Sequence, residues 1–247
     1  MLELDLWLEI AKSAALEGGN YLLQNQGKEL KVLMNSGRDI KLQLDTDTEK
    51  LIKESLSSQS SFSILGEETG LSNNLGEFYW VVDPLDGTSN FLRDIPISCV
   101  SIALMQNKTP ILGVIYDFNH DDLYYGHLES KAFVNQMEIA VSNYAKKSES
   151  TLVTGIPAKT NYSDNEFKQM IADFQQWKKV RMIGSAAMAS IYVAAGKADT
   201  YKENGIFLWD IAAGAAIVNA AGGEASITNM QADYRVDALF TNKHLAS

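Results

Sequence analysis

An apolar strand followed by two closely spaced carboxylates stands in segment 80–88, Trp-Val-Val-Asp-Pro-Leu-Asp-Gly-Thr. Residues 78–82 are aromatic and β-branched, which is typical of a buried strand. Pro84 ends the ladder of that strand because proline has no backbone N–H to donate. Asp83 and Asp86 therefore lie where the strand ends, on either side of a stiffened turn, and both can bind one hard cation.

The residues between and after the two aspartates add further polar groups. The carbonyl of Leu85 is a third oxygen within reach of the same cation. Gly87 and Thr88 open the next segment with free backbone N–H groups, which suit a phosphate oxygen. The segment therefore predicts a metal and phosphate site. The alternative is a structural turn in which the aspartates only accept hydrogen bonds from nearby backbone N–H groups.

Acids elsewhere in the chain favour the metal interpretation. A short strand at 61–65 is followed by the pair Glu67-Glu68, and adjacent acids repel each other unless a cation compensates them. Asp210 precedes an alanine-rich helix predicted over 211–221, where an acid in the first turn is also explained by the helix dipole. Together with the two aspartates of the first motif, Glu67 and Asp210 would complete an all-oxygen site for magnesium or manganese.

Three blocks resemble the signatures of one family. They are GEE at 66–68, DPLDGT at 83–88 and WDIAAG at 209–214, and they resemble those of the inositol monophosphatase family of magnesium-dependent, lithium-sensitive phosphatases. The resemblance extends from about residue 8 to about residue 245. It implies an α/β (α+β) fold, the five-layered α/β/α/β/α sandwich of the inositol monophosphatase and fructose-1,6-bisphosphatase type. It also implies a phosphoric monoester hydrolase that acts on inositol phosphates.

The resemblance also assigns roles to individual residues. The implied ligands of two or three Mg²⁺ ions, with Mn²⁺ as an alternative, are Glu67, Asp83, the Leu85 carbonyl, Asp86 and Asp210. The implied substrate contacts are Gly87, Thr88, Ser185 and Glu203. Asp45 matches the acid that pairs with the motif threonine, Thr88, and this pair and Glu67 would orient the attacking water. Residues 41–44 depart from the family's usual Val-Thr ahead of that acid. Asp47, which would point to the same side of an extended segment, therefore competes with Asp45.

Other positions bear on the substrate. Residues 88–91, Thr-Ser-Asn-Phe, resemble the inositol phosphatase branch more than the nucleotide-bisphosphate branch. Glu203 can accept hydrogen bonds from the hydroxyls of a polyol, and the alternative is a solvated loop acid. We therefore predict a Mg²⁺-dependent phosphomonoesterase for a small polyol or sugar phosphate, with inositol 1-phosphate first. The alternatives are a 3′(2′),5′-bisphosphate nucleotidase, another sugar-phosphate or histidinol-phosphate phosphatase, and a silent member that only binds phosphate.

Composition restricts the partners. A formal net charge of −10 argues against nucleic acid and against an anionic membrane surface, because both demand clustered lysines and arginines. The single cysteine, Cys99, cannot form an internal disulfide, and the first twenty residues show no signal-peptide pattern. We therefore expect a cytoplasmic protein whose partner is a small phosphate ester. Dimerisation is common in the family, so a homodimer is a further expectation.

The 247 residues divide into two closely packed halves in this interpretation. Residues 1–142 form an N-terminal α+β half with the metal motifs, and residues 143–247 form a C-terminal α/β half with Asp210 and the substrate contacts. Residues 104–116 predict a hairpin in the first half, with its turn at Asn107 and the lysine after it. Strands and helices alternate in the second half, with strands at 152–153, 180–183 and 238–241 and helices at 167–177, 186–195 and 211–221.

Overall fold

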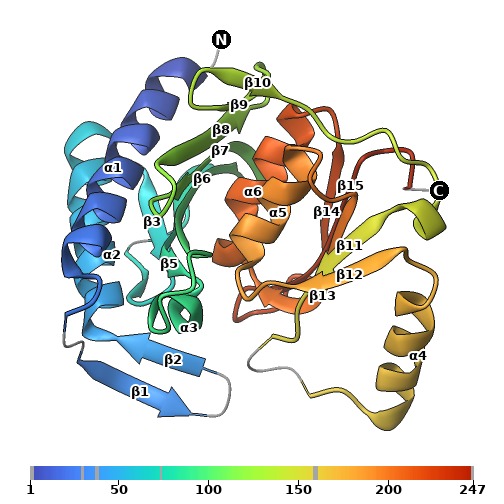
Figure 1. Cartoon of the computed structure of the whole chain (residues 1–247). Helices are drawn as coiled ribbons and strands as arrows, with labels where there is room; N and C mark the ends of the chain where they lie inside the picture. Colours follow the sequence, from blue (N-terminus) through green and yellow to red (C-terminus); the bar gives the residue numbers. More distant parts are fainter. Residues whose placement is uncertain (1–2, 29–30, 37–38, 73, 158–160, 246–247) are drawn as a thin grey trace.

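The molecule is built of five layers. The computed structural model describes residues 3–28, 31–36, 39–72, 74–157 and 161–245. Helices α1 (Leu4–Asn25) and α2 (Gln43–Gln59) form the first layer and cover the outer face of an eight-stranded sheet, the second layer (Figure 1). Helices α5 (Ala186–Ala194) and α6 (Leu208–Ala220) form the middle layer. A five-stranded sheet is the fourth layer, and α4 (Asp164–Phe174) is the fifth. This is the α/β/α/β/α order that the sequence predicts.

The larger sheet carries the first metal motif. Its order is β10-β9-β8-β7-β6-β5-β3-β4, with β3 and β5 parallel and the other pairs antiparallel. Its strands are β3 (Ser63–Gly66), β4 (Gly70–Leu71), β5 (Phe78–Asp86), β6 (Cys99–Gln106), β7 (Thr109–Asp117), β8 (Asp122–His127), β9 (Ala132–Val134) and β10 (Met137–Ile139). The predicted hairpin corresponds to β6 and β7, and Asn107 takes the left-handed conformation in its turn, with φ of 54°.

The smaller sheet mixes the two strand directions. Its order is β12-β11-β13-β15-β14, with β11 parallel to both of its neighbours and β15 antiparallel to both of its own. Its strands are β11 (Thr151–Thr154), β12 (Lys179–Met182), β13 (Thr200–Phe207), β14 (Glu224–Thr228) and β15 (Arg235–Thr241). The sequence indicated β11, β12 and β15 and did not indicate β13 or β14.

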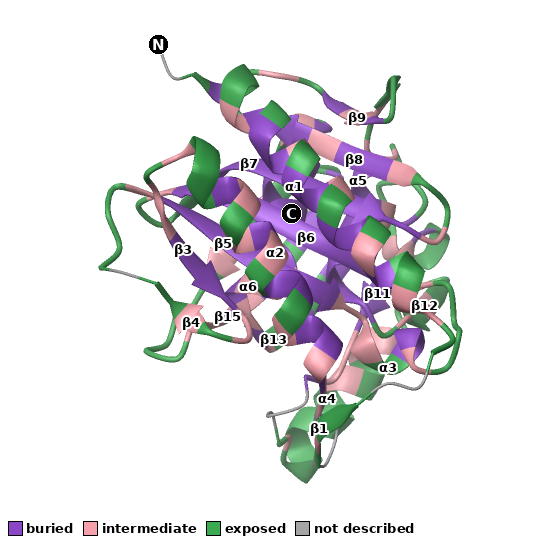
Figure 2. Ribbon diagram, turned by 90° about the vertical axis from the view of Figure 1, so that its left-hand side faces the viewer, coloured by how far each residue is buried: buried purple, intermediate pink, exposed green. Residues whose placement is uncertain are grey.

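Side chains of β5 alternate between two cores. Trp80 and Val82 pack toward α1 and α2, while Tyr79 and Val81 belong to the core around α5 and α6. Asp83 continues the second set, because residues two apart in a strand lie on one face. In Figure 2 the strands of the larger sheet are buried along most of their length, whereas α1 and α2 expose their outer faces.

Small residues bring the middle helices close to the sheets. A Cβ atom on Gly113 of β7 would lie 2.2 Å from the carbonyl oxygen of Ala213 in α6. A Cβ atom on Gly214 would lie 2.3 Å from Cβ of Ser190 in α5. Glycine is therefore required at both positions, and the closeness of these layers depends on it. Helix α6 begins at Leu208, three residues earlier than predicted.

The remaining segments are short. They are β1 (Val32–Ser36), β2 (Asp39–Leu42), the single turn α3 (Thr88–Phe91) and a 3₁₀ turn at Lys147–Glu149. Residues 140–146, where the predicted division at 142 falls, have no regular secondary structure, and the division itself stays a prediction. Within the described ranges, no helix combines the length and apolar character needed to cross a membrane.

Candidate active site

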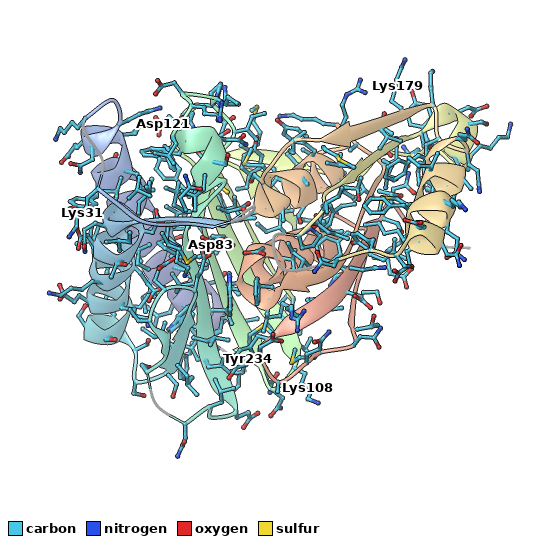
Figure 3. The ribbon with its side chains drawn as sticks, turned by 90° about the horizontal axis from the view of Figure 1, so that it is seen from below. Lys31, Asp83, Lys108, Asp121, Lys179 and Tyr234 are labelled. Atoms are coloured by element: carbon cyan, nitrogen blue, oxygen red, sulfur yellow. The ribbon has the colours of Figure 1, made fainter. Side chains whose placement is uncertain are left out.

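A cavity of about 300 Å³ lies where the two sheets and the middle helices meet. The predicted metal and substrate residues that line it are Glu67, Asp83, Leu85, Asp86, Gly87, Thr88, Ser185, Glu203 and Asp210. Asp83 lies at the centre of the molecule, between the larger sheet and the middle helices (Figure 3). Of the predicted residues, only Asp45 and its competitor Asp47 are absent from the lining.

Three elements deliver the four carboxylates. Glu67 follows β3, Asp83 and Asp86 lie near and at the end of β5, and Asp210 stands in the first turn of α6. The prediction that Pro84 ends the strand is wrong, because the pairing of β5 with β6 is only irregular between Asp83 and Asp86 and resumes at Asp86. Asp83 is buried, and the other three are partly exposed because they face the cavity. Like charges are thus concentrated in one enclosed place, although they come from distant parts of the chain.

Crowding and burial raise the pKa values of all four acids. Burial and the neighbouring Glu68 raise the pKa of Glu67 to about 8, and burial raises the pKa of Asp86 to about 6. The pKa values of Asp83 and Asp210 lie well above their usual range, first because the groups are buried and then because Glu67 is close. No lysine, arginine or histidine is found among the described residues that line the cavity. The described lining therefore offers no positive side chain that would compensate these acids.

Three of the carboxylates accept hydrogen bonds from the protein itself. Asp83 accepts from the backbone N–H of Leu85 at 3.0 Å, and Asp210 accepts from that of Phe207 at 3.2 Å. Asp86 accepts from the Ser185 hydroxyl at 2.5 Å, which joins β5 to the start of α5. In these orientations no three acidic, histidine or cysteine side chains of the described residues form a group ready to hold an ion.

The donor set nevertheless fits a hard divalent cation. It consists of four carboxyl groups and the Leu85 carbonyl, all of them oxygen donors, and none of the described lining residues carries a positive charge. A bound cation would relieve the repulsion that raises the pKa values of Glu67 and Asp83. Rotation of these side chains would bring more of their oxygens together, because no three of the described acids form a ready group in their present orientations.

Asp45 and Asp47 occupy different environments. Both lie in the first turns of α2, so the prediction that they share one side of an extended segment is wrong: two helical residues are about 200° apart around the axis. Asp45 is 3% exposed, and burial raises its pKa to about 7. Its Oδ2 accepts from the backbone N–H of Leu42 at 2.8 Å, and its buried Oδ1 has no hydrogen-bond partner among the described residues. Asp47 is exposed and accepts from the Gln43 amide at 3.0 Å.

Thr88 and Gly87 lie directly beside the metal motif. The Thr88 hydroxyl donates to the Leu85 carbonyl at 3.0 Å and not to Asp45, so the predicted pair is not hydrogen-bonded in this structure. Gly87 has φ of 88°, and a Cβ atom there would lie 2.7 Å from the Ile97 carbonyl oxygen. Only glycine fits this turn, which places Thr88 at the cavity.

Glu203 is a buried strand residue. It lies on β13, is 7% exposed, and accepts a hydrogen bond from the Tyr201 hydroxyl at 3.0 Å. Burial raises its pKa to about 7. The alternative of a solvated loop acid is therefore wrong. Tyr201 also lines the cavity and was not predicted, although period-two alternation places it on the same face as Glu203 once the strand is recognised.

Comparisons with known proteins agree with this geometry. The sequence model of the inositol monophosphatase family matches residues 3–244. The chain belongs to the inositol monophosphatase family. It is 40% identical over 220 residues to "Nus factor SuhB" of Xylella fastidiosa, which covers 87% of this chain and 80% of that protein. It is 37% identical over 229 residues to "Inositol-1-monophosphatase" of Synechocystis sp., which covers 91% of this chain and 79% of that protein.

Solved structures show the same fold. The inositol monophosphatase from Anabaena superposes with a TM-score of 0.85 at 34% identity, covering 98% of this chain and 92% of that one. A Thermotoga maritima inositol monophosphatase superposes with a TM-score of 0.80 at 27% identity, and the match covers 95% of this chain and 91% of that one. The predicted family, fold and enzyme class are therefore confirmed, and the protein is an inositol-phosphate phosphatase of this generally metal-dependent family.

Proposed function

We propose that this family member is a Mg²⁺-dependent phosphomonoesterase for a small polyol phosphate, with inositol 1-phosphate as the first substrate. The observation that carries this proposal is the gathering of four carboxyl groups around one cavity without a positive side chain in its described lining. An anionic phosphate needs positive charge at such a site, and bound cations would supply it. The ligands would be Glu67, Asp83, the Leu85 carbonyl, Asp86 and Asp210, holding two or three Mg²⁺ ions or Mn²⁺.

Bound Mg²⁺ would neutralise charge on the phosphate and lower the pKa of a coordinated water. The protein's own groups orient the reactants. The backbone N–H groups of Gly87 and Thr88 would bind phosphate oxygens, and Glu203 and Ser185 would contact the polyol. Glu67, Asp45 and Thr88 would orient the attacking water, and the buried, unpartnered Oδ1 of Asp45 is the acceptor that supports this role. Positioning and electrostatics supply most of the acceleration in such reactions.

A panel of phosphate esters tests the proposal. Phosphate release is measured with Mg²⁺, with Mn²⁺ and with chelator, on inositol 1-phosphate, fructose 1,6-bisphosphate, histidinol phosphate and 3′-phosphoadenosine 5′-phosphate. We expect metal-dependent release that is fastest on inositol 1-phosphate, with inhibition by lithium ions. A clear preference for the nucleotide would favour the bisphosphate nucleotidase instead. Release from no ester with either metal would favour a silent, phosphate-binding member.

Composition also supports a proposal for the location and the partner of the protein. The buried and single Cys99 suits a reducing compartment, which supports a cytoplasmic location. The net charge of −10 supports a small phosphate ester as partner in place of nucleic acid or membrane. A homodimer is proposed because dimers are common in the family. Light scattering of the purified protein tests this proposal.

A further inference from the structure

Glu49 is a fully buried carboxylate that does not line the cavity. It lies on α2, one helical turn after Asp45, with 0% of its surface exposed. Its nearest cation is Lys53 one turn further on, with Nζ 3.1 Å from Oε1. A buried charge of this kind is unfavourable unless several donors bind it. The donors that bind Glu49 show what it holds in place.

Those donors belong to the loop that carries Glu67. Oε2 of Glu49 accepts from the backbone N–H of Glu68 at 2.8 Å, and Oε1 accepts from that of Thr69 at 3.1 Å. The Thr69 hydroxyl donates to the same Oε1, and Lys53 reaches both that hydroxyl and the Gly70 carbonyl. Glu49 thus binds the two backbone N–H groups that directly follow Glu67.

The other side of Glu67 is fixed by the larger sheet. The backbone N–H of Glu67 donates to the Val82 carbonyl at 3.1 Å, one residue before Asp83. Gly66 allows the approach of Glu49, because a Cβ atom there would lie 2.4 Å from the carboxyl carbon. The backbone of Glu67 is therefore held between β5 on one side and the Glu49 carboxylate on the other.

The side chain of the neighbouring acid is held separately. Lys41 forms an ion pair with Glu68 at 3.1 Å, and the Glu68 side chain is largely buried there and does not line the cavity. Of the two adjacent acids, Glu67 alone faces the cavity. The anchors on Glu68 and Thr69 therefore fix the loop through groups that do not line the cavity.

We propose that Glu49 is a positioning residue that sets the affinity for Mg²⁺ by holding the loop of Glu67. The inference rests on the proposed function, because it takes Glu67 as a metal ligand. A purely structural Glu49 would affect folding stability and leave ion affinity unchanged. A positioning Glu49 changes ion affinity, since groups that orient metal ligands commonly contribute about 10- to 100-fold to it.

The test compares Glu49→Gln with Glu54→Gln, an exposed acid on the same helix whose carboxylate is 3.9 Å from Lys50. Glutamine keeps the size of the side chain but turns an N–H₂ group toward one of the loop donors. Titration calorimetry of the metal-free proteins with Mg²⁺ should show an affinity about 10- to 100-fold weaker for Glu49→Gln and unchanged for Glu54→Gln. At saturating Mg²⁺ the kcat of Glu49→Gln should return close to that of the wild type.

Other outcomes of these measurements would contradict the proposed role of Glu49. A Glu49→Gln protein that melts at lower temperature but binds Mg²⁺ as tightly as the wild type would overturn the inference. If that variant does not fold, Thr69→Val takes its place: it removes one donor to Glu49 at an exposed position, and wild-type affinity there would overturn the inference equally. Asp83→Asn separates the two proposals. If Asp83→Asn binds Mg²⁺ more weakly and Glu49→Gln binds it like the wild type, only the role of Glu49 is rejected. If Asp83→Asn itself binds Mg²⁺ like the wild type, the proposed metal site is rejected.

Discussion

Replacement of Glu203 by glutamine should stabilise the metal-free protein, and the gain should increase with pH. Burial raises the pKa of Glu203 in the folded state from 4.5 to about 7. A carboxyl with a raised pKa contributes to stability in full below the pKa of the unfolded chain, and this contribution is lost as pH rises through the folded pKa. The free energy of unfolding of the wild type should therefore fall between pH 4.5 and about 8.

The size of this effect follows from the two pKa values. The difference between 4.5 and about 7 corresponds to about 3 kcal/mol at 1.36 kcal/mol per pKa unit, almost all of it lost by pH 8. At pH 5 the loss of stability is only about 1 kcal/mol, because this pH lies close to the pKa of 4.5 that Glu203 has in the unfolded chain. Glutamine does not titrate, and its carbonyl can still accept from the Tyr201 hydroxyl. The advantage of Glu203→Gln should grow by about 2 kcal/mol between pH 5 and pH 8.

Urea unfolding in the presence of a chelator measures this advantage. The wild type, Glu203→Gln and Glu224→Gln are compared at pH 5, 6, 7 and 8. Glu224 is an exposed glutamate on β14, so its replacement should change the free energy of unfolding little at every pH. A difference between Glu203→Gln and the wild type that stays constant or shrinks with rising pH would refute the reasoning, because burial would then not penalise the charged form.

Three further predictions concern catalysis. Asp83→Asn should abolish phosphate release at saturating Mg²⁺ and raise the melting temperature in chelator at pH 8, because it removes a buried charge that its neighbours repel. Asp45→Asn should lower kcat far more than it raises KM, while Asp47→Asn stays active; the reverse pattern in steady-state kinetics would assign the role to Asp47. Glu203→Gln should narrow the preference in kcat/KM for inositol 1-phosphate over 3′-phosphoadenosine 5′-phosphate, and an unchanged ratio would remove Glu203 from substrate choice.

Three of the cavity carboxylates could be predicted because each is marked by local sequence. A β-branched strand with Pro84 near its end indicates Asp83 and Asp86, and the start of an alanine-rich helix indicates Asp210. A proline within a strand pattern and the start of a helix can both be recognised from local sequence, and these acids stand at such positions. The sequence therefore indicated these three cavity positions without knowledge of the tertiary contacts.

The environment of Glu203 could not be predicted, because its strand is interrupted. Asn204 and Gly205 are turn formers, and together they indicate a loop. In the structure β13 continues through them with an irregularity in its pairing to β15 between Asn204 and Ile206, and Gly205 takes φ of 76°. The neighbouring strands override the local preference for a turn and bury Glu203.

The position of Asp45 was obscured for a related reason. Helix α2 starts after Leu42, which has no side-chain oxygen to cap the helix, so the usual serine, threonine, aspartate or asparagine signal is missing. Asp45 itself compensates, since its carboxylate accepts from the Leu42 backbone N–H at 2.8 Å. A residue that holds the start of its own helix is fixed in place without any help from a metal, which suits it to orient a group in the site.

The complete site depends on both sheets. Glu67, Asp83 and Asp86 come from the larger sheet and the loop after β3, whereas Glu203 comes from β13 of the smaller sheet and Asp210 from the middle helix α6. Asp86 links β5 to the start of helix α5, because it accepts hydrogen bonds from the Ser185 hydroxyl and, at 2.7 Å, from the Ala187 backbone N–H. Neither sheet can assemble the carboxylates alone, so the close packing of α5 and α6 is a condition for the chemistry. A cation bound by Asp86 and Asp210 would in turn hold the larger sheet to the middle helix α6, which would tie metal binding to the stability of the whole fold.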